Sequence, residues 1–451
     1  MKGKKVSCLA TLVSVILIMS MLLLFGCATA KPATATSPAA SQAPVTATAA
    51  AAPSTTAANN TALPASTGAE KTLKVGLVAW FGWSLGLDQV HDIQVQVEMD
   101  NANGGIEIGG QKYKIDLIVY DTNNSQSTEV AAINRLIFQD NVKYILGDGR
   151  NMSSWLQVAD DNKVVSLVGL TDPSNLDPKY KYTCNPWGTT TFPITVAWFT
   201  QKYPELVKNW VLALSDDFGG HMMEKVIGGP AEVMGAKMNY IYYPAHQTDL
   251  SSLGTKVASL NPGVFSASGL GVVEDGLAMA SAWQAGYRGQ YFCPDASPYG
   301  SLTKVMPAEA LEGFIGGAEG VEFDPPLNAE GVAFKAAYTA KYGKWDDPAT
   351  LTCYYSCLRG ALEKAGTIDT DKVNAVIQGG LRFSTPTGEF QMIPRPEMGN
   401  TRTVDSVCEY SYKIVKNGHI ELLETLTLDR ALEFWSQLGA KMAAGMVPPT
   451  N

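Results

Sequence analysis

The segment Gly82-Trp83-Ser84-Leu85-Gly86 has the spacing G-x-S-x-G and lies between a predicted strand and a predicted helix. This is the local context of the serine nucleophile in α/β hydrolases. The motif follows the first strand of the folded part, however, so the upstream strand and loop that supply an oxyanion hole are missing. We expect the two glycines to form a loop and a helix start, with a serine hydrolase as a rival hypothesis.

Motifs for phosphate, dinucleotide and metal binding are absent or incomplete. No G-x-x-x-x-G-K-[ST] sequence occurs, and Gly147-Asp148-Gly149 lacks the third glycine of a dinucleotide fingerprint. The chain has only 4 histidines, which are widely scattered, and this argues against a His-rich metal centre. We therefore expect no cofactor, no metal ion and no catalytic residue.

The cysteines beyond the N-terminal region offer no clear pairing. Cys353 and Cys357 lie four apart in a predicted helix, a spacing that favours neither a disulfide nor a complete zinc site. With Cys184, Cys293 and Cys408 there are five, so at least one thiol is unpaired in a monomer. We expect buried free thiols; a disulfide is the alternative in an exported protein, without a pair that the sequence identifies.

The composition is that of an acidic globular protein. The chain has 451 residues, of which 46% are hydrophobic and 17% charged, which is enough for a sizeable core and for two or three domains. The formal net charge is -9, with 43 acidic residues against 34 basic ones. Because contacts to phosphate need lysine and arginine surfaces, we expect no nucleic-acid partner.

Residues 1–26 have the features of a secretory signal peptide. A basic start with Lys2, Lys4 and Lys5 precedes a nearly uninterrupted apolar stretch from Val6 to Phe25. Gly26-Cys27 then resembles the bacterial lipobox, which implies a lipoprotein acylated at Cys27, although a phenylalanine before the glycine departs from that pattern. An uncleaved membrane helix is the alternative, since about 20 apolar residues span a bilayer.

A tether is predicted for residues 27–69, beginning at the acylated cysteine. From residue 28 to residue 69, 35 of 42 residues are Ala, Thr, Pro or Ser, and Lys31 is the only charged residue. Such a segment buries too little apolar surface to offset the entropy of ordering, and five prolines interrupt any helix. We expect a disordered, extended tether.

From Glu70 onward the sequence alternates strands and helices in two successive runs. The first run has predicted strands at 73–79, 113–120, 142–146 and 164–169. The second has predicted strands at 210–214, 238–242, 264–268 and 290–293, with helices at 189–203, 219–235, 249–260 and 275–286. This order predicts parallel sheets with helices on both faces, and two similar lobes.

The last part of the chain is less regular. Helices are predicted near 328–342 and 348–365. Strands at 387–392, 407–415 and 420–426 follow, with a hairpin turn at Asn417-Gly418. An amphipathic tail from Leu428 is expected to pack on the body.

The order and spacing of several segments resemble the type I periplasmic solute-binding proteins, in the leucine/isoleucine/valine-binding branch that serves ABC importers. The resemblance covers about residues 72–425. These segments are Val75-Gly76-Leu77, Glu98–Gly105, Ile118–Thr122, Asp140–Gly147, Asp216–Gly219, Thr248–Ser252, Ala285-Gly286-Tyr287 and Ala340–Gly343.

The resemblance implies an α/β fold with two Rossmann-like lobes joined by a hinge. The first lobe is expected to comprise residues 70–187 and about 317–380, and the second residues 188–316 and about 381–427. Residues 428–451 form the tail.

The resemblance also implies a ligand site between the lobes. In the first lobe, Ser153 or Ser154 and the segment Leu170-Thr171 match loops that bind a ligand carboxylate, although N-capping serines and a turn threonine are alternatives.

In the second lobe, Phe218 matches an aromatic contact and Asp295 a contact to a ligand amine. Gly271 and Val272 are expected to line the cleft. A core role for Phe218 and a solvated carboxylate at Asp295 remain the alternatives.

The loop Trp80-Phe81-Gly82-Trp83 departs from the family, because it is far more aromatic than the usual turn. Trp83 is a candidate wall of the pocket for an aromatic or cationic ligand. Trp80 capping the core is the alternative. The expected ligand is therefore an amino acid, an amide, an aromatic acid or a quaternary amine.

These features together predict an extracytoplasmic, lipid-anchored protein, periplasmic or at the cell surface. It is expected to deliver a small polar ligand to ABC permease subunits. A ligand-sensing module that signals to a membrane receptor is the alternative.

Overall fold

The computed structural model describes residues 71–147, 151–169, 177–245, 247–269, 271–345, 351–396 and 400–441. The predicted signal peptide, Cys27 and the predicted tether lie outside the described residues, as do Leu170 and Thr171. No helix in these ranges is long and apolar enough to cross a membrane.

A six-stranded sheet with the order β2-β3-β1-β4-β5-β6 forms the first lobe, and all its neighbouring pairs are parallel except β2–β3. The strands are β1 (Lys71–Ala79), β2 (Ile106–Ile108), β3 (Gln111–Asp121), β4 (Tyr144–Gly147), β5 (Val165–Val168) and β6 (Thr183–Cys184). The predicted parallel sheet is confirmed. The short strands β2 and β6 were not predicted, because two or three residues carry no periodicity.

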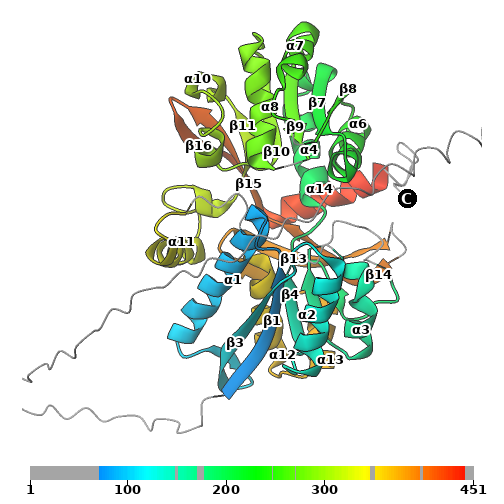
Figure 1. Cartoon of the computed structure of the whole chain (residues 1–451), viewed down its shortest axis with the longest axis vertical. Helices are drawn as coiled ribbons and strands as arrows, with labels where there is room; N and C mark the ends of the chain where they lie inside the picture. The colour runs from blue at the N-terminus through cyan, green and yellow to red at the C-terminus, as the bar shows by residue number, and fades with distance from the viewer. Residues whose placement is uncertain are drawn as a thin grey trace, which may run out of the picture. The chain divides into compact units, whose positions relative to one another are not determined.

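Helices cover both faces of this sheet (Figure 1). On one face, Val75 and Leu77 of β1 share a core with α1 (Ser84–Ala102), α12 (Cys353–Ala365) and α13 (Thr370–Gln378). On the other face, Val78 packs with α2 (Gln126–Phe138) and α3 (Leu156–Asp161). Burial on both faces explains why β1 is a continuous apolar run rather than an alternating one.

The second lobe contains a seven-stranded sheet with the order β16-β15-β11-β10-β9-β7-β8. Its strands are β7 (Trp210–Ser215), β8 (Met238–Tyr243), β9 (Val264–Ser268), β10 (Gln290–Ala296), β11 (Ile315–Ala318), β15 (Tyr410–Lys416) and β16 (His419–Leu426). The strands β7 to β11 run parallel, and the hairpin β15–β16 adds an antiparallel edge. The predicted turn is confirmed, since Asn417 and Gly418 both have positive φ between paired strands.

Two groups of helices cover the faces of the second sheet. They are α4 (Thr191–Lys202), α5 (Phe218–Met223), α6 (Gly229–Val233), α7 (Ser251–Leu260), α8 (Val272–Gln284), α9 (Tyr299–Leu302) and α10 (Ala308–Leu311). The single helix predicted at 219–235 is confirmed as one continuous helical run from Phe218 to Val233, in which a π-helical turn at Glu224–Gly228 lies between α5 and α6. Pro230 is compatible with this turn, since it lacks the N–H that would bond to the carbonyl four residues earlier.

A three-stranded antiparallel sheet of β12 (Arg382–Thr385), β13 (Gly388–Arg395) and β14 (Asn400–Cys408) stands apart from the two large sheets. Phe383 and Phe390 belong to the core of the first lobe, whereas Ile393 and Val407 belong to that of the second. The strand predicted at 407–415 is therefore two strands in two different sheets. They meet at Glu409, whose N–H donates to the carbonyl of Glu389.

The helix α14 (Leu428–Lys441) confirms the predicted amphipathic tail. Its buried residues are Leu428, Ala431, Phe434 and Leu438, at helical spacing. The helix contacts α4 and α6 as well as β13 and β14 (Figure 1). The guanidinium of Arg395 lies 5.0 Å from the Trp435 ring centroid, so α14 is fastened to β13 as well as to the second lobe.

None of the five described cysteines forms a disulfide, and all are buried. Burial raises the pKa of Cys184 and of Cys408 to about 12.

The chain passes between the two lobes in three segments: after β6, after β11 on the way to α12, and between β14 and β15. The first and third crossings meet at the fully buried carboxylate of Asp405. This carboxylate accepts hydrogen bonds from Thr189 N at 3.0 Å, Thr189 Oγ1 at 2.6 Å and Asn185 Nδ2 at 3.2 Å. It also forms an ion pair with Arg395, whose side chain is 11% exposed.

Replacing Asp405 with asparagine should lower the free energy of unfolding by about 3 kcal/mol, because the substitution removes one charge of a largely buried ion pair. Chemical denaturation at neutral pH measures the change. The control is Asp429→Asn, which removes an ion pair with Arg382 in which the aspartate is 83% exposed. That change should cost about 1 kcal/mol or less. Equal costs for the two variants would contradict the structural role of Asp405.

Candidate functional site

The predicted ligand residues follow the carboxyl ends of parallel strands in each sheet. In the first lobe these strands are β1, β4 and β5, and in the second they are β7, β9 and β10. The carboxyl ends of neighbouring parallel strands lie at the same edge, which is where open α/β sheets bind ligands.

The loop after β1 is a packed aromatic turn. The rings of Trp80 and Trp83 stack with centroids 6.5 Å apart, and Phe81 is 39% exposed. A Cβ atom at Gly82 would lie 2.7 Å from Trp80 Nε1, and one at Gly86 would lie 2.3 Å from the Trp80 carbonyl oxygen. Both glycines of the G-x-S-x-G motif are thus explained by close packing against Trp80, as the sequence predicts for a loop and helix start.

The segment after β4 is held by a buried carboxylate that sequence reasoning missed. Glu129 of α2 is fully buried and accepts hydrogen bonds from Asn151 Nδ2 at 3.0 Å and from Trp155 Nε1 at 2.6 Å. Between these two donors lie the predicted residues: Ser153 is exposed, and Ser154 Oγ donates to the Asn151 carbonyl at 2.6 Å. Glu129 lies in the first turn of α2, where an acidic residue is common on the solvent face, so its position in the sequence does not reveal its burial.

The segments after β7 and β9 approach each other through glycines. A Cβ atom at Gly220 would lie 1.8 Å from the Ser215 carbonyl oxygen, and one at Gly219 would lie 2.9 Å from the Gly269 carbonyl oxygen. Asp217 caps α5, since its Oδ1 accepts from Gly220 N at 2.9 Å and from Ser215 Oγ at 2.7 Å. Phe218 is the first residue of α5, and its side chain lies outside the described residues.

Gly271 and Val272 lie at the start of α8. Gly271 is its N-cap and has a φ of 133°, which explains why glycine occupies this position. Val272 is half-buried and packs against the core of the second lobe, so its side chain has a structural role there.

Asp295 lies within β10, which extends to Ala296 rather than ending at 293 as predicted. The register between β10 and β11 shifts between Cys293 and Ala296. The side chain of Asp295 lies outside the described residues. The aspartate therefore occupies an irregular strand end, and not the loop that the sequence suggested.

A buried lysine fixes the segment that follows β10. Lys413 of β15 is inaccessible to solvent, and its Nζ donates to the Ser297 carbonyl at 2.5 Å. The same Nζ donates to Oε1 and Oε2 of Glu322 at 2.7 and 2.6 Å, and Glu322 Oε1 also accepts from Tyr299 N at 2.7 Å. Glu322 lies on the second crossing, between β11 and α11 (Ala329–Tyr342). Through its hydrogen bonds to Glu322 and Ser297, Lys413 thus connects the second crossing to the end of β10, which carries Asp295.

The described residues contain no candidate metal centre at these strand ends. No group of three or more His, Cys, Asp or Glu residues among them could hold a metal ion. A cavity of about 230 Å³ is bounded by α1, α11 and α12, and one of about 180 Å³ is lined by Pro298, Tyr299 and Glu322 next to the end of β10. None of the predicted ligand residues lines either cavity.

The fold is shared with solved periplasmic binding proteins. A leucine-binding protein from Thermotoga maritima is 20% identical, with a TM-score of 0.59, covering 79% of this chain and 99% of its own. An ABC transporter solute-binding protein from Rhodopseudomonas palustris in complex with 3,4-dihydroxybenzoic acid is 17% identical, with a TM-score of 0.62 and coverages of 80% and 98%.

A branched-chain amino acid ABC transporter periplasmic ligand-binding protein from Burkholderia xenovorans is 16% identical, with a TM-score of 0.62 and coverages of 81% and 98%. A comparison with curated proteins returns no match.

The family model described as "Periplasmic binding protein" matches residues 72–404, which include both large sheets up to β11 and nearly all of the small one. The match extends over most of the chain and agrees with the two α/β lobes, their parallel sheets and the three crossings. This chain belongs to the periplasmic binding protein family and has its type I fold.

Proposed function

We propose that the protein is the extracytoplasmic solute-binding lipoprotein of an ABC importer. It captures an amino acid or a related small polar molecule between its two lobes and presents it to permease subunits. The observation that carries this proposal is the family match over residues 72–404, together with predicted ligand residues at the strand ends of both sheets. Solved relatives of the same fold are described as binding leucine, benzoate and 3,4-dihydroxybenzoate.

In the first lobe, the proposed contacts for a ligand carboxylate are Ser153, Ser154, Leu170 and Thr171. Ser153 is the stronger candidate of the two serines, because it is exposed while the hydroxyl proton of Ser154 is directed to the Asn151 carbonyl. Glu129 supports the proposal, since its hydrogen bonds fix the segment that presents Ser153. Removing the serine hydroxyl would leave this scaffold intact.

In the second lobe, the proposed ligand contacts are Phe218, Gly271, Val272 and Asp295. The side chain of Val272 is half-buried and packs against the core of the second lobe, so the proposed contact is made through its backbone. Asp295 is the proposed partner of a ligand amine, and the buried lysine behind its strand end keeps the backbone there in one position.

Trp83 supplies the proposed aromatic wall. It stacks with Trp80 and is followed directly by α1, so its backbone position is fixed. An aromatic surface at this place favours an aromatic or cationic ligand over a purely aliphatic one.

A thermal-shift screen should identify the ligand class. The full chain, purified in mild detergent, is tested against amino acids, betaines, amides and aromatic acids. A ligand that binds only the folded state stabilises it by about 2.7 kcal/mol at 100 times its dissociation constant, which raises the midpoint. No shift with any of the four classes would contradict capture of a small polar solute.

Asp295→Ala should weaken the binding of an amine-bearing ligand by more than about tenfold, because it removes a charge-assisted hydrogen bond. Isothermal titration calorimetry gives the dissociation constant. The matched control is Asp161→Ala at an exposed position on α3, which should leave the constant unchanged. Equal constants for wild type and Asp295→Ala would remove Asp295 from the site.

Cys27→Ser should release the protein from membranes, because the thiol is the proposed site of acylation. Fractionation by ultracentrifugation measures the soluble share. A variant that still pellets with membranes would show that the apolar segment at 6–25 remains attached or that another anchor exists.

A further inference from the structure

The cavity of about 180 Å³ is built from both lobes. Its walls come from α9 and β16 of the second lobe, from Glu322 on the second crossing, and from α11 with the residues that follow this helix. Helix α11 is itself held by α1 of the first lobe, where Gln94 Oε1 accepts a hydrogen bond from the Tyr342 hydroxyl at 3.0 Å. We call this space the α9–α11 cavity.

Two lysines give the α9–α11 cavity cationic groups. Lys335 of α11 is half-buried, and Lys344, just after the helix, is exposed. Lys335 Nζ donates to the Phe323 carbonyl at 2.9 Å. An ammonium group carries three N–H donors, so a further acceptor in the cavity can bind beside this carbonyl.

The burial of Lys335 is not offset by the acidic groups near it. Burial lowers the pKa of Lys335, and the carboxylates of Asp324 and Glu322, which act in the opposite direction, do not restore it. An anion next to the ammonium group would stabilise the charged form of this lysine.

Glu322 also lines the cavity, but its charge is already compensated. Lys413, which is inaccessible to solvent, donates to its two carboxylate oxygens at 2.7 and 2.6 Å. The backbone N–H of Tyr299 donates to Oε1 as well, at 2.7 Å. Because this carboxylate is paired with a buried ammonium group, it is a poor partner for a cation in the cavity and repels an anion only weakly.

The other side chains of the lining offer apolar surface, from Pro298, Tyr299, Trp345 and Ile420. The ring centroid of Trp345 lies 5.6 Å from Lys335 Nζ, so the indole and the ammonium group are close enough to attract each other. A molecule in the cavity therefore contacts cationic groups and apolar surface together.

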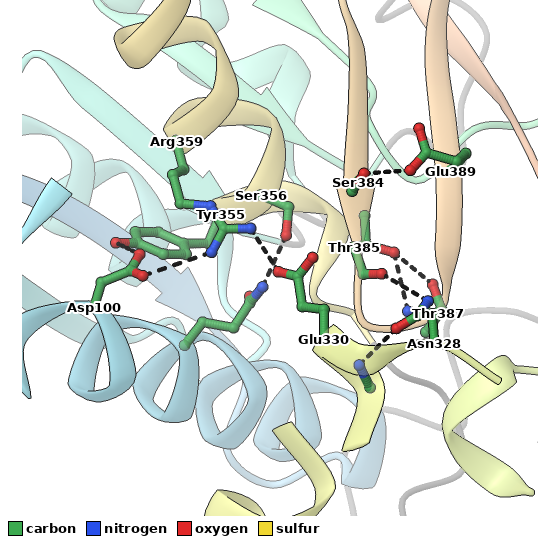
Figure 2. Close-up of polar contacts among 12 residues, drawn as sticks. Asp100, Asn328, Glu330, Tyr355, Ser356, Arg359, Ser384, Thr385, Thr387 and Glu389 are labelled. Carbon is green, nitrogen blue, oxygen red and sulfur yellow. Dashed lines mark hydrogen bonds and ion pairs between the residues drawn. The ribbon is translucent and has the colours of Figure 1, made fainter. Parts of the chain in front are cut away.

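The cavity of about 230 Å³ has a different charge balance. There Arg359 forms ion pairs with Glu330 and with Asp100 (Figure 2). One guanidinium thus already serves two carboxylates, and a further anion would be repelled by them. Of these two cavities, an anion should enter the α9–α11 cavity.

We propose that the α9–α11 cavity binds a short-chain carboxylate at a second ligand site, separate from the proposed transport site at the strand ends. The carboxylate accepts hydrogen bonds from Lys335 and Lys344, and the alkyl part lies against Trp345 and Ile420. A volume of about 180 Å³ has room for about six non-hydrogen atoms, which is the size of butyrate.

Isothermal titration of the full chain in mild detergent with butyrate tests the proposal, with butyramide as an uncharged probe of the same shape. We expect a dissociation constant of about 1 mM or tighter for butyrate, and binding at least about tenfold weaker for butyramide. Absence of measurable butyrate binding, or equal binding of the two probes, would overturn the proposal.

Two variants assign the binding to this cavity. Lys335→Met removes the ammonium group but keeps the aliphatic part of the side chain, so it should weaken butyrate by about tenfold. Ile420→Trp keeps both lysines and fills the cavity with a larger side chain, so it should abolish binding. Thermal midpoints close to that of wild type identify the variants that remain folded. Retained affinity in either folded variant would overturn the proposal.

Two controls separate this site from other sources of affinity. Lys341→Met, on the same helix but at a lysine that is ion-paired with Glu98, should bind butyrate like wild type. Ser153→Ala removes a proposed carboxylate contact of the transport site and should also leave butyrate binding unchanged. Loss of butyrate binding in Ser153→Ala would place butyrate in the transport site, which would overturn the second site and leave the proposed transport function intact.

Discussion

The buried carboxylate of Asp405 is the contact on which the connection between the two lobes depends. It receives the side chain and the backbone of the first crossing through Asn185 and Thr189, and it is itself part of the strand that leads into the third crossing. A buried carboxylate accepts hydrogen bonds only from donors at set distances and directions. Apolar side chains could fill the same space, but the two segments could then slide past each other, because apolar contacts have no preferred direction. The ion pair with Arg395 therefore fixes how the crossings lie against each other, whatever its net contribution to stability.

A second buried ion pair, between Lys413 and Glu322, fixes the position of the second crossing, which follows β11. Lys413 and Glu322 are 0% and 7% exposed, and among the ion pairs of the described residues only this pair and Arg395–Asp405 are so deeply buried. The others have partners exposed by 17% or more. Deep ion pairs thus occur where the chain passes between lobes, and not within either α/β lobe, where apolar cores suffice.

The sequence predicts the long strands of the two large sheets because most of them are apolar runs, and it misses the short strands β2 and β6. The prediction from sequence fails where one continuous strand-like run contributes to two different sheets. The run 407–415 is uniformly strand-like, yet Glu409 separates a strand of the small sheet from one of the large sheet, which only tertiary pairing reveals. Glu129 and Lys413 are likewise invisible in the sequence, since a charged residue in an amphipathic element is normally placed on its solvent face.

The ligand residues illustrate the same division between local and tertiary information. Glycines at 82, 86, 219, 220 and 271 stand where backbone segments or rings approach closely or where φ is positive, so their positions follow from local geometry. What the glycines do not determine is how each strand end is held. The segments after β7 and β9 pack closely against each other. The segment after β10 is instead hydrogen-bonded to Glu322 of the second crossing and to Lys413. Any movement of Glu322 must therefore carry Lys413 and the Tyr299 backbone with it or break the three hydrogen bonds that its carboxylate accepts. The strand end that bears Asp295 is thus coupled to the second crossing, whereas the segments after β7 and β9 are coupled to each other.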